Sequence, residues 1–246
     1  IVTVSPNEGT VGTPITITGT GFSANYLVKI GFGNTASRTS SLTGGSGTFT
    51  ATFTIDTQVD GTCTITAQCS VNTATNSLRI KPAIILVTPI EGSVGTLVTV
   101  SGNGFGNQHT IRVVFGNTAT MATVSSAVIG SFTTSFTVDE QVYGSTAVRA
   151  YDDTDNVNVV YGQLFTIKPN ITLVSPKSGT VESEVRVTGN GFGESESVRI
   201  KFGTTETIAT TLSTGTGYFD TTFTVDNQSI GINTITAIGL NTSQQA

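Results

Sequence analysis

The sequence has little charge and few of the residues on which catalytic and metal sites depend. Only 11% of its 246 residues are charged, and it contains one histidine, two cysteines, one methionine and no tryptophan. Globular domains carry about 25% charged residues. Since 37% of the residues are hydrophobic, the composition is opposite to that of a disordered chain, which combines low hydrophobicity with high charge density. The chain is therefore expected to fold around hydrophobic cores.

Two further absences exclude classes of partner. The net charge is -5 and no cluster of lysine and arginine occurs, so we expect no nucleic-acid partner. No apolar run approaches the roughly 20 residues of a membrane-spanning helix, so we expect no membrane insertion. The sequence opens at Ile1 without the pattern of a signal peptide, which predicts a mature chain or an excised fragment.

Threonine is abundant and makes up about one residue in five. β-branched and aromatic residues fit the pleated surface of a sheet. Within residues 15–19 and 49–55, hydrophobic residues or glycine alternate with threonine. This period of two indicates antiparallel strands with one buried face and one solvent-exposed face.

One sequence unit occurs three times. Each copy carries a Ser/Thr-Pro-x-x-Gly motif, then a Gly-x-Gly-Phe motif, then a Phe-Gly pair. The proline, the motif's phenylalanine and the last phenylalanine are Pro6, Phe22 and Phe32, then Pro89, Phe105 and Phe115, then Pro176, Phe192 and Phe202. The constant spacing predicts three domains. We call them unit 1 (residues 1–82), unit 2 (residues 83–169) and unit 3 (residues 170–246).

Short strands, frequent turn signals and the lack of a helical period predict immunoglobulin-like sandwiches. The repeated motifs resemble those of the IPT/TIG family of immunoglobulin-like domains, and the resemblance covers units 1 and 2 in full and most of unit 3. It implies an all-β fold of three tandem immunoglobulin-like β-sandwich domains. Glu182 departs from the pattern, because Gly12 and Gly95 stand at its position in the other units. We therefore expect a different local turn in unit 3.

The joints between the units are short. Lys81-Pro82 and Lys168-Pro169 leave almost no free linker, and proline fixes one dihedral while it biases the preceding residue to extended geometry. We expect a stiff, rod-like arrangement. At about 35 to 40 Å per domain, three units would reach roughly 100 to 120 Å.

Most phenylalanines are predicted to form the cores. Twelve of the 13 fall at equivalent positions, four in each unit, and only Phe165 stands outside this pattern. The Gly-x-Gly-Phe motif lacks the third glycine and the helix of a dinucleotide loop. A turn that needs a positive φ, with phenylalanine as its core anchor, explains the motif better.

The feature without a counterpart in the other units is the last hairpin of unit 2, which is four residues longer around residues 152–156. Its tip supplies the candidate contacts for a partner, which are Tyr151, Asp152, Asp153, Asp155 and Tyr161. Clustered carboxylates can bind Ca²⁺. The spacing is not that of an EF-hand, and solvated acidic turns are common, so we expect no metal site and leave calcium as the alternative.

No arrangement of residues indicates catalysis. His109 stands where the other units have Tyr26 and Glu196, which favours a surface histidine over a general base. Cys63 and Cys69 lie about 20 Å apart on a straight strand, whereas a disulfide needs Cα atoms within about 7 Å, so two unpaired thiols are expected. We expect a protein that is not an enzyme and has no catalytic residue and no cofactor.

Unit 3 stops before the segment that ends the other two units at residues 77–81 and 164–168. One explanation is that the chain is a fragment of a longer array. The other is that a neighbouring subunit donates the strand. The N-terminal residues 1–4 correspond to residues 84–87 and 171–174, so we expect them to be needed in their own unit.

These observations favour a non-enzymatic, extracellular or cell-surface structural protein. In this hypothesis the stiff rod is part of a filament, a surface layer or an adhesin stalk, and its partners are other copies or neighbouring domains of a longer chain. The alternative is a spacer or carbohydrate-contacting accessory segment of a larger secreted polysaccharide-degrading enzyme. The IPT/TIG resemblance is compatible with both, because fold alone does not fix function.

Overall fold

The computed structural model describes the chain except for Ile1, Val71, Val157 and Asn158, and it describes the backbone but not the side chains of residues 159–161. Every regular element of the described residues is a β-strand. These residues accordingly contain no helix that could span a membrane. The strands form six sheets, two in each unit. The all-β sandwich fold expected from the sequence is confirmed.

Unit 1 contains a three-stranded and a five-stranded sheet. The first consists of β1 (Val2–Ser5), β3 (Pro14–Gly19) and β6 (Phe49–Thr54) in this order. The second consists of β2 (Glu8–Gly9), β8 (Asn72–Ile80), β7 (Gly61–Cys69), β4 (Leu27–Phe32) and β5 (Thr35–Leu42). All pairs are antiparallel except β2 with β8, which is parallel.

Unit 2 repeats this layout. Its first sheet consists of β14 (Phe132–Thr137), β11 (Leu97–Asn103) and β9 (Ala83–Thr88). Its second consists of β10 (Glu91–Gly92), β16 (Val159–Ile167), β15 (Gly144–Asp152), β12 (Thr110–Phe115) and β13 (Thr118–Ser125). The enlarged hairpin predicted from the sequence is the connection between β15 and β16.

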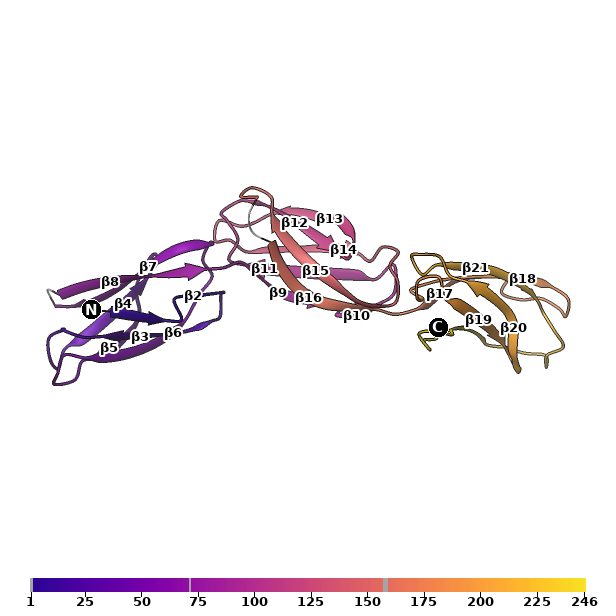
Figure 1. Cartoon of the computed structure of the whole chain (residues 1–246), viewed down its shortest axis with the longest axis horizontal. Coiled ribbons are helices and arrows are strands. Elements are labelled where there is room, and N and C mark those ends of the chain that lie inside the picture. The colour runs from indigo at the N-terminus through magenta and orange to yellow at the C-terminus, as the bar shows by residue number, and fades with distance from the viewer. Residues whose placement is uncertain (1, 71, 157–158) are drawn as a thin grey trace.

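Unit 3 has the same first sheet but a smaller second sheet. The first consists of β17 (Asn170–Ser175), β18 (Glu184–Asn190) and β21 (Phe219–Thr224). The second contains β20 (Thr205–Leu212), β19 (Ser197–Phe202) and β22 (Ile235–Gly239). Within the described residues, counterparts of β2 and β8 do not form. Figure 1 shows the three units following one another along the long axis of the molecule.

The alternation of hydrophobic residues with threonine in the sequence corresponds to a buried and an exposed face of each strand. In β3 the side chains of Ile15 and Ile17 are buried, while the threonines between them are exposed. On the exposed face, hydroxyl groups pair across strands, as in Thr3 with Thr18 at 2.6 Å and Thr99 with Ser135 at 3.0 Å. Such pairs stabilise the sheet without introducing charge.

The cores of the three units repeat the same aromatic contacts. All twelve phenylalanines at equivalent positions are buried, as predicted. The phenylalanine of each Gly-x-Gly-Phe motif packs edge to face on a second ring, with centroid distances of 5.2, 5.1 and 5.2 Å in units 1 to 3. Phe165, which has no aromatic counterpart in the other units, is also buried and packs against Phe115 at 5.7 Å.

The prediction of a different turn at Glu182 is wrong. Glu182 has a φ of 71°, close to the 90° of Gly12 and the 91° of Gly95. Its N–H donates to the carbonyl of Val225 at 2.8 Å, as the N–H of Gly12 does to the carbonyl of Ile55 at the same distance. The turn is thus conserved in shape, and the glutamate adopts a left-handed conformation that costs a residue with a Cβ about 1 to 2 kcal/mol.

Both cysteines lie on β7, which runs without interruption to Cys69. Cys69 is buried, Cys63 is half-buried, and neither is bridged. Burial, followed by the nearby charge of Asp56, raises the pKa of the Cys63 thiol. The strand therefore does not make the bend that a disulfide between these positions would require.

Candidate functional site

In units 2 and 3, the Gly-x-Gly-Phe turn lies at the end that meets the preceding unit. The second glycine has a φ of 80° at Gly21, 75° at Gly104 and 76° at Gly191, which confirms the predicted positive φ. The N–H of the following phenylalanine donates to a glycine carbonyl in the loop before β6, β14 or β21, for example from Phe105 to Gly130 at 3.0 Å. The ring enters the core while the backbone stays at the end of the unit.

The same hydrogen bond joins the units at both joints. At the first joint, the N–H of Asp60 in unit 1 donates to the carbonyl of Phe105 in unit 2 at 3.3 Å. At the second, the N–H of Tyr143 in unit 2 donates to the carbonyl of Phe192 in unit 3 at 2.9 Å. These donors and acceptors occupy equivalent positions of the repeat, so the two joints share this hydrogen bond.

The turn glycines also fit against the Lys-Pro segments. A Cβ at Gly104 would lie 2.7 Å from the carbonyl oxygen of Lys81, and one at Gly191 would lie 2.5 Å from that of Lys168. At Gly21, where the described residues place no preceding unit, a Cβ would meet nothing within 4 Å. Only glycine permits this approach of the two backbones.

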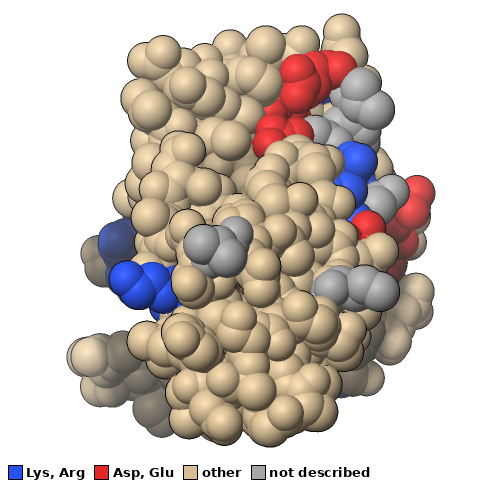
Figure 2. All heavy atoms as spheres, turned by 90° about the vertical axis from the view of Figure 1, so that its left-hand side faces the viewer, with Lys and Arg blue, Asp and Glu red and all other residues tan. Residues whose placement is uncertain are grey.

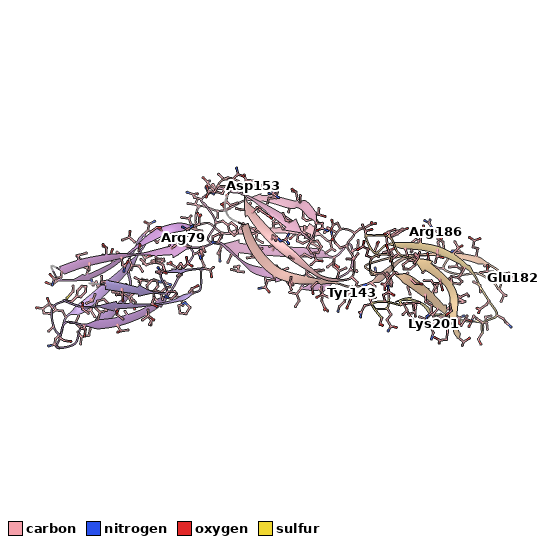
Figure 3. The ribbon with its side chains drawn as sticks, viewed as in Figure 1. Arg79, Tyr143, Asp153, Glu182, Arg186 and Lys201 are labelled. Carbon is pink, nitrogen blue, oxygen red and sulfur yellow. The ribbon has the colours of Figure 1, made fainter. Side chains whose placement is uncertain are left out.

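Two of the residues labelled in Figure 3, Asp153 and Tyr143, mark the two ends of unit 2. Asp153 lies at the end that faces unit 1, and Tyr143 lies at the end that faces unit 3. The long hairpin therefore sits beside the first joint. The second joint has a further contact, since the hydroxyl of Thr216 donates to Glu140 at 3.3 Å.

Asp152 is the buried centre of the hairpin tip. It is only 2% exposed. Its carboxylate accepts hydrogen bonds from the backbone N–H groups of Gly106 at 3.3 Å, Thr154 at 3.1 Å and Asp155 at 3.4 Å. Among the candidate partner contacts, Asp152 thus faces the protein interior, because its charge satisfies backbone donors of two loops.

His109 pairs with this carboxylate. Its Nδ1 lies 2.8 Å from Asp152 and 3.8 Å from Asp155, and its side chain is 21% exposed. The hydrogen bond with Asp152 raises the pKa of His109, burial opposes this effect, and the charges of Asp155 and of Asp60 in unit 1 add to the rise. The surface histidine expected from the sequence is instead a half-buried member of an ion pair beside the joint.

The cluster also has the composition of a metal site, because ligand atoms of His109, Asp152 and Asp155 all lie within 4.8 Å of one another. However, the oxygens of Asp152 already accept bonds from three backbone N–H groups and from His109. These bonds account for its burial without an ion. The arrangement is suited to hold the hairpin tip against the loop that contains Gly106.

The other tip residues lie nearer the surface. Arg112 donates to both oxygens of Asp153, at 2.9 and 3.0 Å, and its guanidinium stacks 4.7 Å from the ring centre of Tyr151. Tyr151 and Asp153 are half-buried and Asp155 is exposed. The side chain of Tyr161, the fifth candidate contact, lies outside the described residues. A partner at this tip would meet the edge of the Arg112 stack and the carboxylate of Asp155.

Unit 3 places a carboxylate in the same location from the loop that precedes β19. Glu196, at the position of His109, is 1% exposed and accepts bonds from the N–H groups of Gly193, Asn241 at 3.2 Å and Thr242 at 3.0 Å. Gly193 corresponds to Gly106. A sequence signal for this exchange is Gly239, which stands at the position of Asp152. A Cβ at this position would lie 2.4 Å from Glu196 Oε1, so glycine leaves room for the carboxylate.

We expect unit 2 to lose stability as pH rises. Because the folded state raises the pKa of His109 above its usual value of about 6.5, the stabilisation is fully present below that pH and is lost as pH rises through the folded pKa. Each unit of pKa difference corresponds to about 1.4 kcal/mol. Since His109 is the sole histidine, an NMR titration of its ring measures the folded pKa directly.

The controls for this titration come from the same cluster. Asp152→Asn should bring the pKa of His109 down toward its usual value, and His109→Gln should remove the part of the pH dependence of unit 2 that lies above about pH 6.5. A folded pKa at or below about 6.5 in the unaltered chain would contradict the expected ion pair.

The paired sheets, the shared phenylalanine contacts and the turn-to-turn joints define an immunoglobulin-like β-sandwich protein of tandem units. The sequence model of the IPT/TIG domain matches residues 82–167 and 169–244. The chain belongs to the IPT/TIG domain family. A comparison with curated protein sequences finds no match.

Three solved structures to which the chain is similar are an integrin-binding protein, an adhesin and an ectodomain fragment. The bacterial integrin-binding protein invasin is 17% identical with a TM-score of 0.34, and the match covers 100% of this chain and 58% of invasin. The Yersinia pseudotuberculosis adhesin InvE is 14% identical with a TM-score of 0.32, with coverages of 80% and 64%. An ICAM-5 D1–D4 fragment is 13% identical with a TM-score of 0.26, with coverages of 100% and 74%. The chain spans just over half the length of invasin.

Proposed function

We propose that residues 1–82, 83–169 and 170–246 are three domains of a non-enzymatic, extracellular structural segment. It acts as a stiff rod within a filament, a surface layer or an adhesin stalk. The observation that carries the proposal is the repeated joint, in which Asp60 bonds to Phe105 and Tyr143 bonds to Phe192. A joint that is repeated with equivalent groups gives each unit a defined position on the next.

The surface supports this role. Seen along the long axis from the N-terminal side, the molecule is dominated by uncharged residues, with a few acidic and basic groups toward the sides of the view (Figure 2). Hydroxyl pairs such as Ser101 with Thr133, at 2.9 Å, lie on the exposed sheet faces. Nucleic-acid binding would need a continuous basic stripe, which this face lacks.

Electron microscopy of the purified chain tests the rod. We expect particles of roughly 100 to 120 Å with a narrow spread of lengths, because fixed joints hold three units of about 35 to 40 Å each end to end. Particles bent by widely different angles at the joints would contradict the proposal.

The domain content and the cellular location of the native protein that contains this segment distinguish the structural role from an accessory role. We expect a chain built of domains without a catalytic fold, located outside the cell or at its surface. If the native protein instead carries a polysaccharide-degrading domain, the segment is a spacer and the structural proposal fails.

A further inference from the structure

The loop before β12 carries both the histidine of unit 2 and the contact with unit 1. The carbonyl of Phe105 accepts the N–H of Asp60 across the first joint, and the next residue, Gly106, donates its N–H to Asp152 at 3.3 Å. His109 ends the same loop, directly before β12. One short loop therefore connects the first joint to the pair of His109 and Asp152.

This loop is closely packed against the histidine. A Cβ at Gly106 would lie 1.9 Å from Nδ1 of His109, so the imidazole lies directly on the loop backbone. The hydroxyl of Ser126 donates to the carbonyl of Gly106 at 2.6 Å and accepts the N–H of His109 at 2.9 Å. Since closely packed groups transmit displacement to one another, a change in the interactions of His109 reaches the carbonyl of Phe105.

Unit 1 lies against the same loop. A Cβ at Gly130, whose carbonyl accepts the N–H of Phe105, would lie 3.1 Å from the Cα of Val59 in unit 1. The next residue of unit 1, Asp60, is half-buried. Its charge contributes to the rise in the pKa of His109. A charge of unit 1 thus acts on a titratable group of unit 2.

Three carboxylates from two units act on the imidazole of His109. Asp152 and Asp155 come from the long hairpin of unit 2, with oxygens 2.8 and 3.8 Å from Nδ1. Asp60 comes from unit 1, and the charges of all three carboxylates favour the protonated ring. In return, a positive charge on the ring offsets the repulsion among the carboxylates.

The other elements around His109 add no net charge within the described residues. Residues 106–108 of its own loop are glycine, asparagine and glutamine. The loop after β13 contributes Ser126. On β12, Arg112 is paired with Asp153. When the imidazole is neutral, the carboxylate of unit 1 therefore faces two carboxylates of unit 2, and like charges repel.

The second joint is built without this arrangement. Tyr143 stands at the position of Asp60, and Glu196 stands at the position of His109. The carboxylate of Glu196 accepts the N–H of Gly193 without an imidazole beside it, since His109 is the sole histidine of the chain. The second joint therefore serves as an internal control for the first.

We propose that His109 is a pH-dependent switch of the first joint: the protonated imidazole holds units 1 and 2 in a fixed orientation, and its deprotonation loosens this joint but not the second. Loss of the proton restores the repulsion between Asp60 and the hairpin carboxylates of Asp152 and Asp155. By linkage, formation of the joint and binding of the proton favour each other. The inference rests on the fixed joints of the proposed function.

Distances between spin labels at equivalent positions test the switch in the full chain. Ser40, Thr123 and Thr210 are exposed and occupy equivalent positions of β5, β13 and β20. After Cys63→Ala and Cys69→Ala remove the natural thiols, Ser40→Cys with Thr123→Cys spans the first joint, and Thr123→Cys with Thr210→Cys spans the second. As pH rises through the folded pKa of His109, the distance distribution across the first joint should broaden, with its midpoint at that pKa. The distribution across the second joint should not change.

Asp60→Asn tests the charge across the joint. It removes the carboxylate but keeps the backbone N–H that bonds to Phe105. The folded pKa of His109, followed by NMR, should fall by about 0.2 to 0.7 pH units, the range expected for one partly exposed charge. The first joint should then stay narrow at high pH. Glu140→Gln removes an exposed carboxylate beside the second joint instead, and it should change neither the pKa nor the first joint.

The outcomes separate the switch from the rod. A first joint whose width does not change with pH overturns the switch, and so does equal broadening at both joints. Broadening that persists unchanged in Asp60→Asn would mean that unit 2 itself loosens, which also overturns it. Narrow, pH-independent distributions at both joints would contradict the switch alone, whereas broad distributions at both joints at every pH would contradict the rod as well.

Discussion

Replacing Glu196 with alanine is expected to lower the free energy of unfolding of unit 3 by about 3 kcal/mol or more. The buried carboxylate accepts bonds from the N–H groups of Gly193, Asn241 and Thr242. Each hydrogen bond to a charged group contributes about 1.5 to 3 kcal/mol, and water at the tip replaces part of the loss. For a domain of this size, the melting temperature should fall by roughly 12 to 24 °C. Calorimetry of the full chain measures this loss.

Glu194→Ala is the matched control, because Glu194 lies two residues away and is exposed. A surface substitution of this kind changes stability by no more than about 0.5 kcal/mol. Glu196→Gln should lose less than Glu196→Ala, since its amide oxygen still accepts a hydrogen bond. If unit 3 has the same melting temperature in both alanine variants, the Glu196 carboxylate does not stabilise the turn.

Replacing Gly104 with alanine is expected to disturb the first joint as well as unit 2. The positive φ alone costs about 1 to 2 kcal/mol. In addition, the new Cβ would lie 2.7 Å from the Lys81 carbonyl, so the two backbones must separate. We expect a loss of about 3 kcal/mol in unit 2 and a wider range of angles between units 1 and 2. Small-angle X-ray scattering of the full chain measures the change in shape.

Gly21→Ala measures the cost of the positive φ alone, without a contact across a joint. Gly21 has a similar φ of 80°, and a Cβ there meets nothing within 4 Å. This variant should destabilise unit 1 by about 1 to 2 kcal/mol and leave the scattering unchanged. Indistinguishable scattering of the two variants would mean that the contact between Gly104 and Lys81 does not set the joint.

The sequence predicted the fold well because the relevant signals are local and repeated. Alternation of Ile15 and Ile17 with threonine needs only the period of a strand. The Gly-x-Gly-Phe motif needs only the conformational freedom of glycine at Gly104 and its counterparts. Since every signal occurs three times at constant spacing, each copy supports the interpretation of the others.

The candidate site was less accessible to sequence reasoning because its contacts join distant segments. Asp152 is buried by donors from Gly106 and His109, which lie 46 and 43 positions away. An acidic turn read in isolation looks solvated, so the tip was interpreted as a surface. The role of Glu196 was missed for the same reason. The turn at Glu182 was mispredicted because its partner, the Val225 carbonyl, stabilises a conformation that the sequence alone disfavours.

The parallel pairing of β2 with β8 and of β10 with β16 determines how the array responds to tension. Pulling the two ends of unit 1 apart drives β2 and β8 past each other, so the bonds from Arg79 to Asn7 and from Lys81 to Gly9 are stretched together. Unit 2 has the same clamp. Units 1 and 2 are therefore expected to resist force until these backbone bonds break together.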